Sequence, residues 1–320
     1  MTRSPERRGS REKSSGGPGD EGALRAARAT CAAPAAGAAD PARAEARPPV
    51  GPGGRGGTRG IFLLHGLVST GDVFGAAFDR PAAGRRLVVP DLLGFGRSLD
   101  EGRGAFTLAD HLDALDEVAA RTGLFDTRPL VVGAHSLGSS LALHWARRHP
   151  GRVDGIVCWG APVYRDAEAV RARLRANLMT RLFVLDTPWA RRACALNCRH
   201  RRAAGWFAAV TDPSLPVPVA RAASLHTWPA YRDALRHLVL EVDWARLLDP
   251  PGPPVRLVWG DADPVGDRDL ARRLAADRPR VTVAVVPGAD HHLPLAHPEV
   301  CLAHLRELTA GATTRALTPR

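Results

Sequence analysis

The sequence predicts an α/β fold in which a mostly parallel β-sheet is flanked by helices. Short runs of apolar, often β-branched residues recur along the chain and are typical of buried strands. The stretches that follow them have apolar residues every three or four positions, as expected for one face of a helix. The two patterns alternate from residue 61 to residue 159. Such alternation favours parallel strands with helices on both faces of the sheet.

The first 59 residues differ from the rest of the chain. They are rich in Arg, Gly, Pro, Ala and Ser and contain almost no large apolar side chains. Such a segment buries too little apolar surface to offset the entropy that is lost on ordering. We therefore expect residues 1–59 to form a disordered tail without a strand.

The first part of the core is expected over residues 60–164. Apolar runs predict strands at 61–64, 86–89, 130–132 and 155–159. Thr107 is a suitable N-cap for a helix. The apolar residues that share one face of this helix are Leu108, Leu112, Leu115 and Val118. A second helix is expected at 141–146, directly after the third strand.

The alternation breaks between residues 165 and 245. The stretches 174–185 and 231–242 look helical, prolines interrupt the segment, and no buried-strand pattern is present. We expect residues 165–245 to form a helical cap that is inserted over the carboxyl edge of the sheet.

The last part of the chain returns to the earlier patterns. Strands are predicted at 255–259 and 281–286, with a helix near 267–276 between them. A final helix is expected to end at about residue 308. We therefore assign residues 246–310 to the core and residues 311–320 to a flexible C-terminus.

Composition and charge exclude several classes of protein. The chain has 320 residues and a net charge of +11, of which +5 lies in residues 1–60 and +6 in residues 165–245. The arginines are scattered and no nucleic-acid-binding module is recognisable, so no specific nucleic-acid partner is expected. No stretch approaches the ~18 apolar residues of a transmembrane segment, and the N-terminus lacks the apolar core of a secretion signal. The five irregularly spaced cysteines do not suggest a disulfide framework, so we expect a cytoplasmic protein.

A sharp strand-to-helix turn is predicted at Ser136. The apolar run ends in Gly-Ala-His-Ser-Leu-Gly-Ser-Ser at 133–140, and a helix pattern follows at once. Strand and helix nearly touch at such a turn, and Ala134 and Gly138 are small enough to allow this. The pattern is typical of a nucleophile elbow, in which the serine hydroxyl projects above the sheet. The alternative is a serine that only caps the helix of another doubly wound fold.

Two further side chains are expected at the same edge of the sheet. Asp263 follows the strand at 255–259, and His291 follows the strand at 281–286. Active sites of open parallel sheets lie at the carboxyl ends of the strands. A serine hydroxyl needs an adjacent base to become a nucleophile, and a histidine oriented by a carboxylate supplies one.

From residue 61 to about residue 308 the chain resembles α/β-hydrolases of the capped kind. Five motifs carry the resemblance: His65-Gly66, Asp91-x-x-Gly94-x-Gly96-Arg97-Ser98, the turn at Ser136, Gly260-x-x-Asp263, and Gly288-Ala289-Asp290-His291 followed by Pro298-Glu299. The resemblance implies that Ser136 is the nucleophile, Asp263 the orienting acid and His291 the base. It also implies an oxyanion hole formed by the backbone amides of Leu67 and Leu137, with no cofactor and no metal.

The resemblance is incomplete at the amino end of the sheet. These enzymes usually have two strands before the His-Gly loop, and residues 1–60 show no strand signal. Without them the strand at 86–89 would be an exposed edge, which invites pairing. Either the tail covers this edge, or another chain does so in a homo-oligomer, or the protein is less stable than its relatives.

Neighbouring residues compete for the roles of acid and base. Asp261 lies two residues before Asp263, but the spacing from the preceding glycine favours Asp263. His292 follows His291, and the spacing to the Pro-Glu pair downstream favours His291.

Other histidines and cysteines are interpreted as structural. His65 is expected to support the oxyanion loop, and His135 to be a packed side chain. Cys194, Cys198 and His200 lie close together in the sequence but lack a fourth ligand. We therefore expect ordinary thiols rather than a zinc site.

The serine nucleophile narrows the reaction class. The dehalogenases and epoxide hydrolases that resemble this architecture use aspartate instead. We predict a serine hydrolase that cleaves a carboxylic ester or related small acyl substrate through an acyl-enzyme. The alternatives are a C–C bond hydrolase, thioesterase or amidase with the same three residues, or a catalytically idle binding protein. The arginine excess of residues 165–245 favours an acidic or amphipathic substrate.

Overall fold

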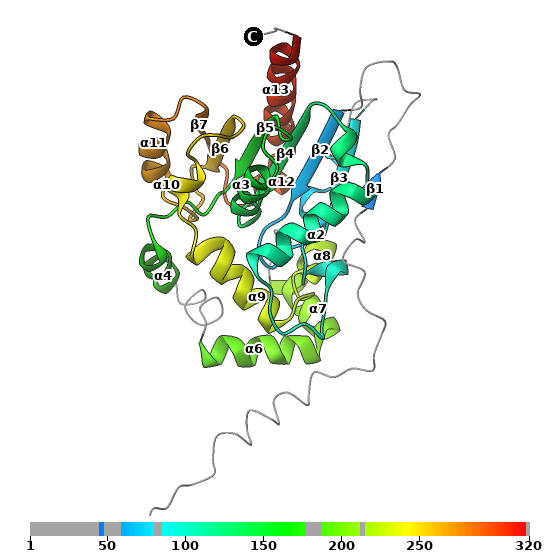
Figure 1. Cartoon of the computed structure of the whole chain (residues 1–320). Helices are drawn as coiled ribbons and strands as arrows, with labels where there is room; N and C mark the ends of the chain where they lie inside the picture. The colour runs from blue at the N-terminus through cyan, green and yellow to red at the C-terminus, as the bar shows by residue number, and fades with distance from the viewer. Residues whose placement is uncertain (1–44, 48–58, 80–84, 177–186, 212–214, 318–320) are drawn as a thin grey trace, which may run out of the picture.

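A seven-stranded sheet forms the centre of the computed structural model, which describes residues 45–47, 59–79, 85–176, 187–211 and 215–317 (Figure 1). The strand order is β1-β3-β2-β4-β5-β6-β7. Strands β2 to β7 are parallel and span Arg59–Leu64, Arg85–Val89, Leu130–His135, Gly155–Trp159, Val255–Gly260 and Val281–Val286. The mostly parallel sheet predicted from the apolar runs is confirmed.

Strand β1 (Glu45–Arg47) lies in the segment that was expected to contain no strand. It pairs antiparallel with β3, with Ala46 opposite Val88. The prediction was wrong at these three residues because a short edge strand can form through backbone pairing alone, without an apolar pattern in its sequence. The tail therefore covers β3, which is the first of the three alternatives for this edge. The exposed edge on which the predicted homo-oligomer depended is not present at β3.

Alternate strand residues pack on opposite faces of the sheet. In β2, Phe62 and Leu64 contact one core, whereas Ile61 and Leu63 contact the other. The first core includes α2 (Leu108–Arg121), α3 (Gly138–Arg148), α10 (Trp244–Leu247) and α11 (Arg268–Ala276). The second includes the 3-10 helix η1 (Gly71–Phe74), α12 (Leu293–Ala296) and α13 (Pro298–Leu317). Helices thus cover both faces, as predicted.

Helix α2 begins as expected at Thr107. The Thr107 hydroxyl accepts a hydrogen bond from the Asp110 amide, and the Asp110 carboxylate accepts one from the Thr107 amide. This reciprocal capping box satisfies two amides that the first turn of the helix leaves unpaired.

Helix α13 continues past the point where a flexible end was expected. The prediction of flexibility from residue 311 was wrong for residues 311–317, and residues 318–320 lie outside the described part of the chain. Thr309 and Ala312 are both buried, and the Thr309 hydroxyl donates to the Leu305 carbonyl at 2.6 Å. Small residues therefore form the buried face here, and they carry a weak apolar signal.

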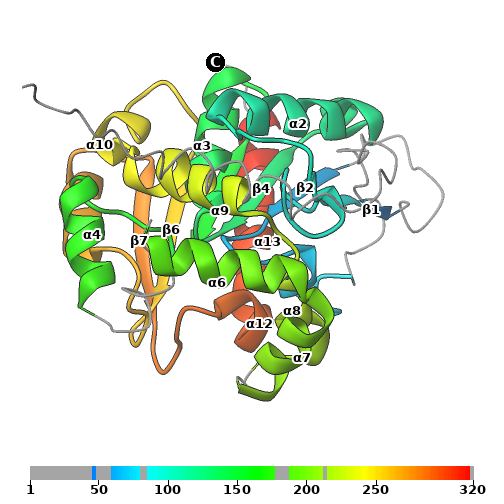
Figure 2. The same cartoon turned by 90° about the horizontal axis from the view of Figure 1, so that it is seen from below.

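Every described element between β5 and β6 is helical, as predicted for residues 165–245. These elements are α4 (Ala167–Arg175), α6 (Pro188–Arg199), α7 (Arg201–Thr211), α8 (Val217–Ala222), α9 (Trp228–Leu235), the π-helix η4 (Arg236–Leu240) and α10. Most of the helix predicted at 174–185 lies outside the described residues. Figures 1 and 2 show α6 and α7 at the end of the molecule opposite the C-terminal end of α13. No helix in the described ranges is both long and apolar enough to cross a bilayer.

Candidate active site

Ser136 occupies the turn between β4 and α3. Its φ of +52° lies in the left-handed region, which a non-glycine residue adopts only at a cost. A Cβ atom at Gly138 would lie 2.6 Å from the His65 carbonyl oxygen and 2.7 Å from that of Leu64. The small residue expected at this position is thus required by the close approach of α3 to the loop after β2.

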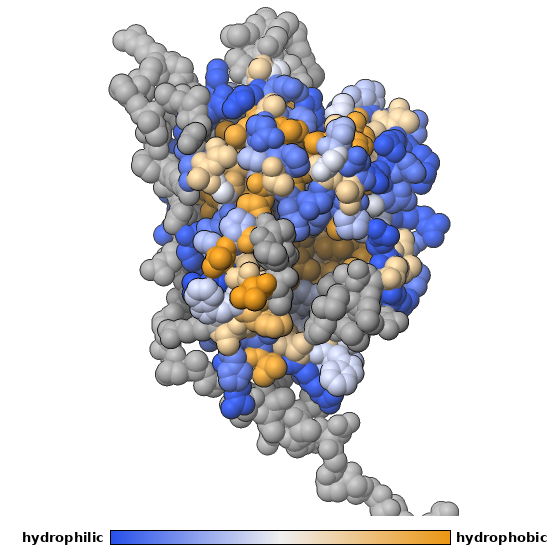
Figure 3. All heavy atoms as spheres, turned by 180° about the vertical axis from the view of Figure 1, so that it is seen from behind, coloured by the Kyte–Doolittle hydropathy of each residue, from blue (hydrophilic) through white to orange (hydrophobic). Residues whose placement is uncertain are grey.

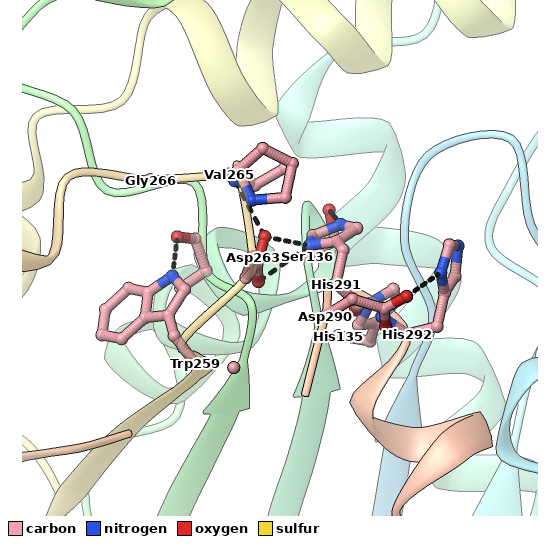
Figure 4. Close-up of polar contacts among 12 residues, drawn as sticks. His135, Ser136, Trp259, Asp263, Val265, Gly266, Asp290, His291 and His292 are labelled. Carbon is pink, nitrogen blue, oxygen red and sulfur yellow. Dashed lines mark hydrogen bonds and ion pairs between the residues drawn. The ribbon is translucent and has the colours of Figure 1, made fainter. Parts of the chain in front are cut away.

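Three loops at the carboxyl edge of the sheet bring Ser136, His291 and Asp263 together (Figure 4). Asp263 follows β6 and His291 follows β7, as the sequence predicts. His291 Nε2 lies 3.1 Å from Ser136 Oγ, and His291 Nδ1 lies 3.0 and 3.1 Å from the two carboxylate oxygens of Asp263. All three predicted residues are therefore within hydrogen-bonding distance in the order Ser-His-Asp.

The environments of these three side chains differ in solvent access. The Asp263 carboxylate is fully buried and also accepts a hydrogen bond from the Val265 amide at 2.8 Å. The His291 side chain is 20% exposed, and Ser136 is half-buried. A buried carboxylate that accepts from Nδ1–H leaves Nε2 free to accept from the serine hydroxyl. The arrangement can remove a proton from Ser136 and stabilise the imidazolium that results.

Gly160 lies against His291 and Asp263 and was not singled out from the sequence. It directly follows β5 and has a φ of +61°. A Cβ atom there would lie 2.8 Å from His291 Nδ1 and 2.9 Å from Asp263 Oδ2. The glycine that ends the apolar run Ile-Val-Cys-Trp is the sequence signal that could have indicated it.

The His135 side chain contacts the backbone of His291. Its Nε2 lies 2.8 Å from the His291 carbonyl oxygen, and the two imidazole rings are 4.8 Å apart. Complete burial lowers the pKa of His135 well below its ordinary value, so the neutral ring donates its Nε2–H to the carbonyl. His135 is packed, as expected, and in addition it supports the loop that carries His291.

His65 holds the loop after β2 in place. Its Nε2 accepts a hydrogen bond from the Leu92 amide at 2.8 Å, and its Nδ1–H donates to the Gly66 carbonyl at 2.8 Å. Both ring nitrogens are used in structural hydrogen bonds. Burial lowers the pKa of His65, which keeps the ring neutral. This agrees with its interpretation as structural support.

The backbone amides of Leu67 and Leu137 belong to two segments that meet at Ser136. Leu137 follows Ser136 and directly precedes α3, and Leu67 follows Gly66 in the loop after β2. A Cβ atom at Gly66 would lie 2.9 Å from Ser136 Cβ, so this loop abuts the serine. Within the described part of the chain, neither amide donates a hydrogen bond to a backbone or side-chain acceptor.

The competing residues lie apart from this chain of hydrogen bonds. Asp261 is exposed, and His292 Nδ1 lies 3.6 Å from the Asp290 carboxylate. Cys194 Sγ lies 4.0 Å from Cys198 Sγ, and the Cys198 thiol donates to the His226 carbonyl. Among the residues that the structure describes, no group of three His, Cys, Asp or Glu side chains has an arrangement suited to a metal ion.

Comparisons with known proteins identify the family and the fold of this chain. Residues 61–298 match the family model described as alpha/beta hydrolase fold. The chain is 30% identical over 116 residues to the probable lysophospholipase BODYGUARD 2 of Arabidopsis thaliana, a match that covers 35% of this chain and 24% of that protein. It is 26% identical over 243 residues to the uncharacterized protein Rv2715 of Mycobacterium tuberculosis, which covers 72% of this chain and 69% of that protein.

The length of the matches differs between relatives. The chain spans 24–52% of the length of the four Arabidopsis relatives that it matches. Among solved structures, a thermophilic esterase from Thermogutta terrifontis has a TM-score of 0.59 and 22% identity, and the match covers 80% of this chain and 91% of that one. This similarity indicates a common fold.

Proposed function

The chain belongs to the alpha/beta hydrolase fold family, and from that premise we propose that it is a serine hydrolase. The proposed reaction is cleavage of a carboxylic ester or a related small acyl substrate through an acyl-enzyme. The observation that carries the proposal is the unbroken series of hydrogen-bonding distances from Ser136 Oγ through His291 to the buried Asp263 carboxylate. The names of two similar proteins, an esterase and a probable lysophospholipase, agree with an acyl ester as substrate.

In the proposed mechanism Ser136 attacks the acyl carbon while His291 Nε2 takes the hydroxyl proton. Asp263 stabilises the imidazolium and holds its Nδ1–H. The negative charge on the carbonyl oxygen is stabilised by the amides of Leu67 and Leu137, the second of which is at the N-terminus of α3. His291 then protonates the leaving group, and later takes a proton from the water that hydrolyses the acyl-enzyme.

The substrate class is proposed from a cavity of about 670 Å³ between α4 and the α9–η4 segment. One face of each helix lines it, and both faces combine apolar and arginine side chains. The lining residues are Ala167, Arg171, Arg175, Thr187, Trp228, Tyr231, Arg232, Leu235, Arg236, Leu240 and Glu241. An acyl substrate that carries a carboxylate would match the apolar and basic character of this lining.

Other residues of the helices that line the cavity contact the loops of the proposed catalytic site. On α4, Arg173 Nε donates to the carbonyl of Pro264, which follows Asp263. On η4, the Leu238 carbonyl accepts from the Ser140 hydroxyl in the first turn of α3. Arg175, Arg232 and Arg236 have carboxylate partners, whereas Arg171 has none among the described residues. Arg171 is therefore the arginine best placed to bind a substrate carboxylate.

Labelling with a fluorophosphonate probe tests the proposed reaction. The wild type should be labelled, because the probe reacts only with an activated serine. Ser136→Ala should abolish labelling and hydrolysis of a neutral ester while the melting temperature stays close to that of the wild type. Labelling that persists in Ser136→Ala, or a folded wild type that neither labels nor hydrolyses esters, would favour the idle binding protein.

A further inference from the structure

Helices α6, α7 and α8 carry every strongly exposed large hydrophobic side chain found among the described residues. Trp189 is 67% exposed, Phe207 71% and Val210 77%. The other three are Leu196, Trp206 and Val217. Exposed apolar residues scattered singly are ordinary, but a collection confined to three consecutive helices indicates an interaction surface.

Four of these side chains form two pairs, each on one face of its helix. Trp189 and Leu196 are seven residues apart on α6, and Trp206 and Val210 are four apart on α7, so each pair lies on one face of its helix. Helix α7 packs closely on α8, where Gly205 approaches the backbone of Arg221. Figure 3 shows hydrophobic residues reaching the surface in the lower part of the molecule, where α7 and α8 lie. We call the six residues the apolar surface of α6–α8.

The charges around this surface are almost all positive. Residues 187–211 and 215–232 contain no Asp or Glu, and the acidic residues that border these ranges in the sequence are Asp186, Asp212 and Asp233. The exposed arginines of these helices are Arg191, Arg192, Arg199 and Arg221, and none has an acidic partner in the described part of the chain. A nearby carboxylate, Glu101, is already paired with Arg201. The surface is therefore both apolar and basic.

Two of these arginines lie directly over exposed tryptophans. The Arg192 guanidinium is 5.8 Å from the Trp189 ring, and the Arg221 guanidinium is 5.0 Å from the Trp206 ring. Each pair places a cation beside an amphipathic ring. Such a pair suits the boundary between phosphate headgroups and acyl chains, where tryptophan is favoured.

We propose that the apolar surface of α6–α8 docks on the surface of an anionic lipid bilayer. The aromatic and aliphatic side chains enter the outer part of the acyl region, and the arginines bind lipid phosphates. Charge complementarity selects this partner, because arginines of α6 lie on the same face as its exposed apolar side chains, so that cationic and apolar groups would reach lipid headgroups and acyl chains together. In Figure 1, α6 and α7 lie at the end of the molecule opposite the C-terminal end of α13, so docking through them would leave the sheet outside the bilayer. The proposal does not depend on the catalytic activity.

Sedimentation of the full-length protein with vesicles tests the docking. One set contains equal parts of phosphatidylglycerol and phosphatidylcholine, and the other contains phosphatidylcholine alone. We expect binding to the anionic set at physiological ionic strength and weaker binding at higher salt. The pair Phe207→Ser and Val210→Ser, and separately the pair Arg192→Gln and Arg199→Gln, should each weaken binding about tenfold or more.

Matched variants separate this surface from other positive charges. Arg246→Gln with Arg272→Gln removes two exposed charges elsewhere on the folded part and should leave binding unchanged. Thermal unfolding of each variant confirms that it folds. Absence of binding to anionic vesicles would overturn the proposal. Vesicle binding that is abolished by the triple change Arg7→Gln, Arg8→Gln and Arg11→Gln, but not by the α6–α8 variants, would also overturn it. A third such outcome is a protein that binds no vesicles but forms a dimer, which dissociates when Phe207→Ser and Val210→Ser are combined.

Discussion

The imidazole of His135 donates a hydrogen bond of 2.8 Å to the carbonyl oxygen of His291. The residue before Ser136 thus positions the backbone of His291, the proposed base. Replacing His135 with Ala should lower kcat about tenfold, because one buried hydrogen bond contributes roughly 1–1.5 kcal/mol. His135→Gln, which keeps an N–H donor, should recover most of the activity. Equal rates for the two variants in an ester assay would contradict a positioning role.

Asp263 should keep the proton of neutral His291 on Nδ1, so that Nε2 can accept the serine proton. Asp263→Asn keeps the shape of the side chain but offers an amide to Nδ1, so Nε2 would carry the proton and could not accept the serine hydroxyl. We expect kcat to fall by roughly 10⁴. The matched control is Asp261→Asn, because Asp261 is exposed two residues earlier. A large loss of kcat in the control, rather than in Asp263→Asn, would assign the acid to Asp261.

Gly160 should be needed for catalysis beyond its backbone conformation. In Gly160→Ala the new methyl group would press on both His291 and Asp263, so kcat should fall at least about tenfold. Gly151 has a similar φ of +71° but nothing within 4 Å of a Cβ atom, so Gly151→Ala adds only the backbone strain. Gly151→Ala should lose about 1–2 kcal/mol of unfolding free energy, and Gly160→Ala should lose at least as much because its methyl group also meets close neighbours. A fully active Gly160→Ala would contradict this account.

His111 should make the fold sensitive to acid. It is buried in α2, neither ring nitrogen has a hydrogen-bond partner among the residues that the structure describes, and burial lowers its pKa to about 4. The unfolded chain takes up a proton near pH 6.5 while the folded protein does not, so stability is lost as the pH falls from 6.5 towards 4. In His111→Leu, the loss of unfolding free energy between pH 7 and pH 5 should be smaller by about 2 kcal/mol. Urea denaturation at both pH values measures it, and an unchanged pH dependence would contradict it.

Arg171 should determine a preference for acidic substrates. Two esters of equal acyl length are compared, one neutral and one with a terminal carboxylate. We expect kcat/KM to favour the carboxylated ester, and Arg171→Gln to reduce that preference about tenfold without changing the neutral ester. Arg246→Gln, an exposed arginine outside the cavity, is the control. If the wild type hydrolysed the two esters at equal rates, the proposed preference for acidic substrates would be contradicted, whereas the proposed ester hydrolysis would not.

The parallel strands could be predicted because each is an almost continuous apolar run. Strand β4 has apolar or small residues at each of its first five positions, since helices cover both of its faces. Strand β1 could not be predicted in the same way. Its residues Glu-Ala-Arg carry no apolar pattern, and only the neighbouring β3 backbone makes them a strand.

The positions of Ser136, Asp263 and His291 followed from their places after three strands, because the carboxyl ends of parallel strands meet at one edge. The contacts of His135 and Gly160 could not be predicted. They depend on how closely the loop after β7 approaches the ends of β4 and β5, and a pattern along the sequence does not specify that distance. The cavity lining likewise depends on the packing of α4 against η4.

The three-residue strand β1 has a practical consequence for recombinant production. A shortened form that starts at residue 60 would begin just before the first apolar run of β2 and would lack the backbone that pairs with β3. The bare amide and carbonyl groups of β3 would then offer a template for strands of other molecules, and precipitation during expression is the expected result. Shortening that stops before Glu45 leaves this protection in place.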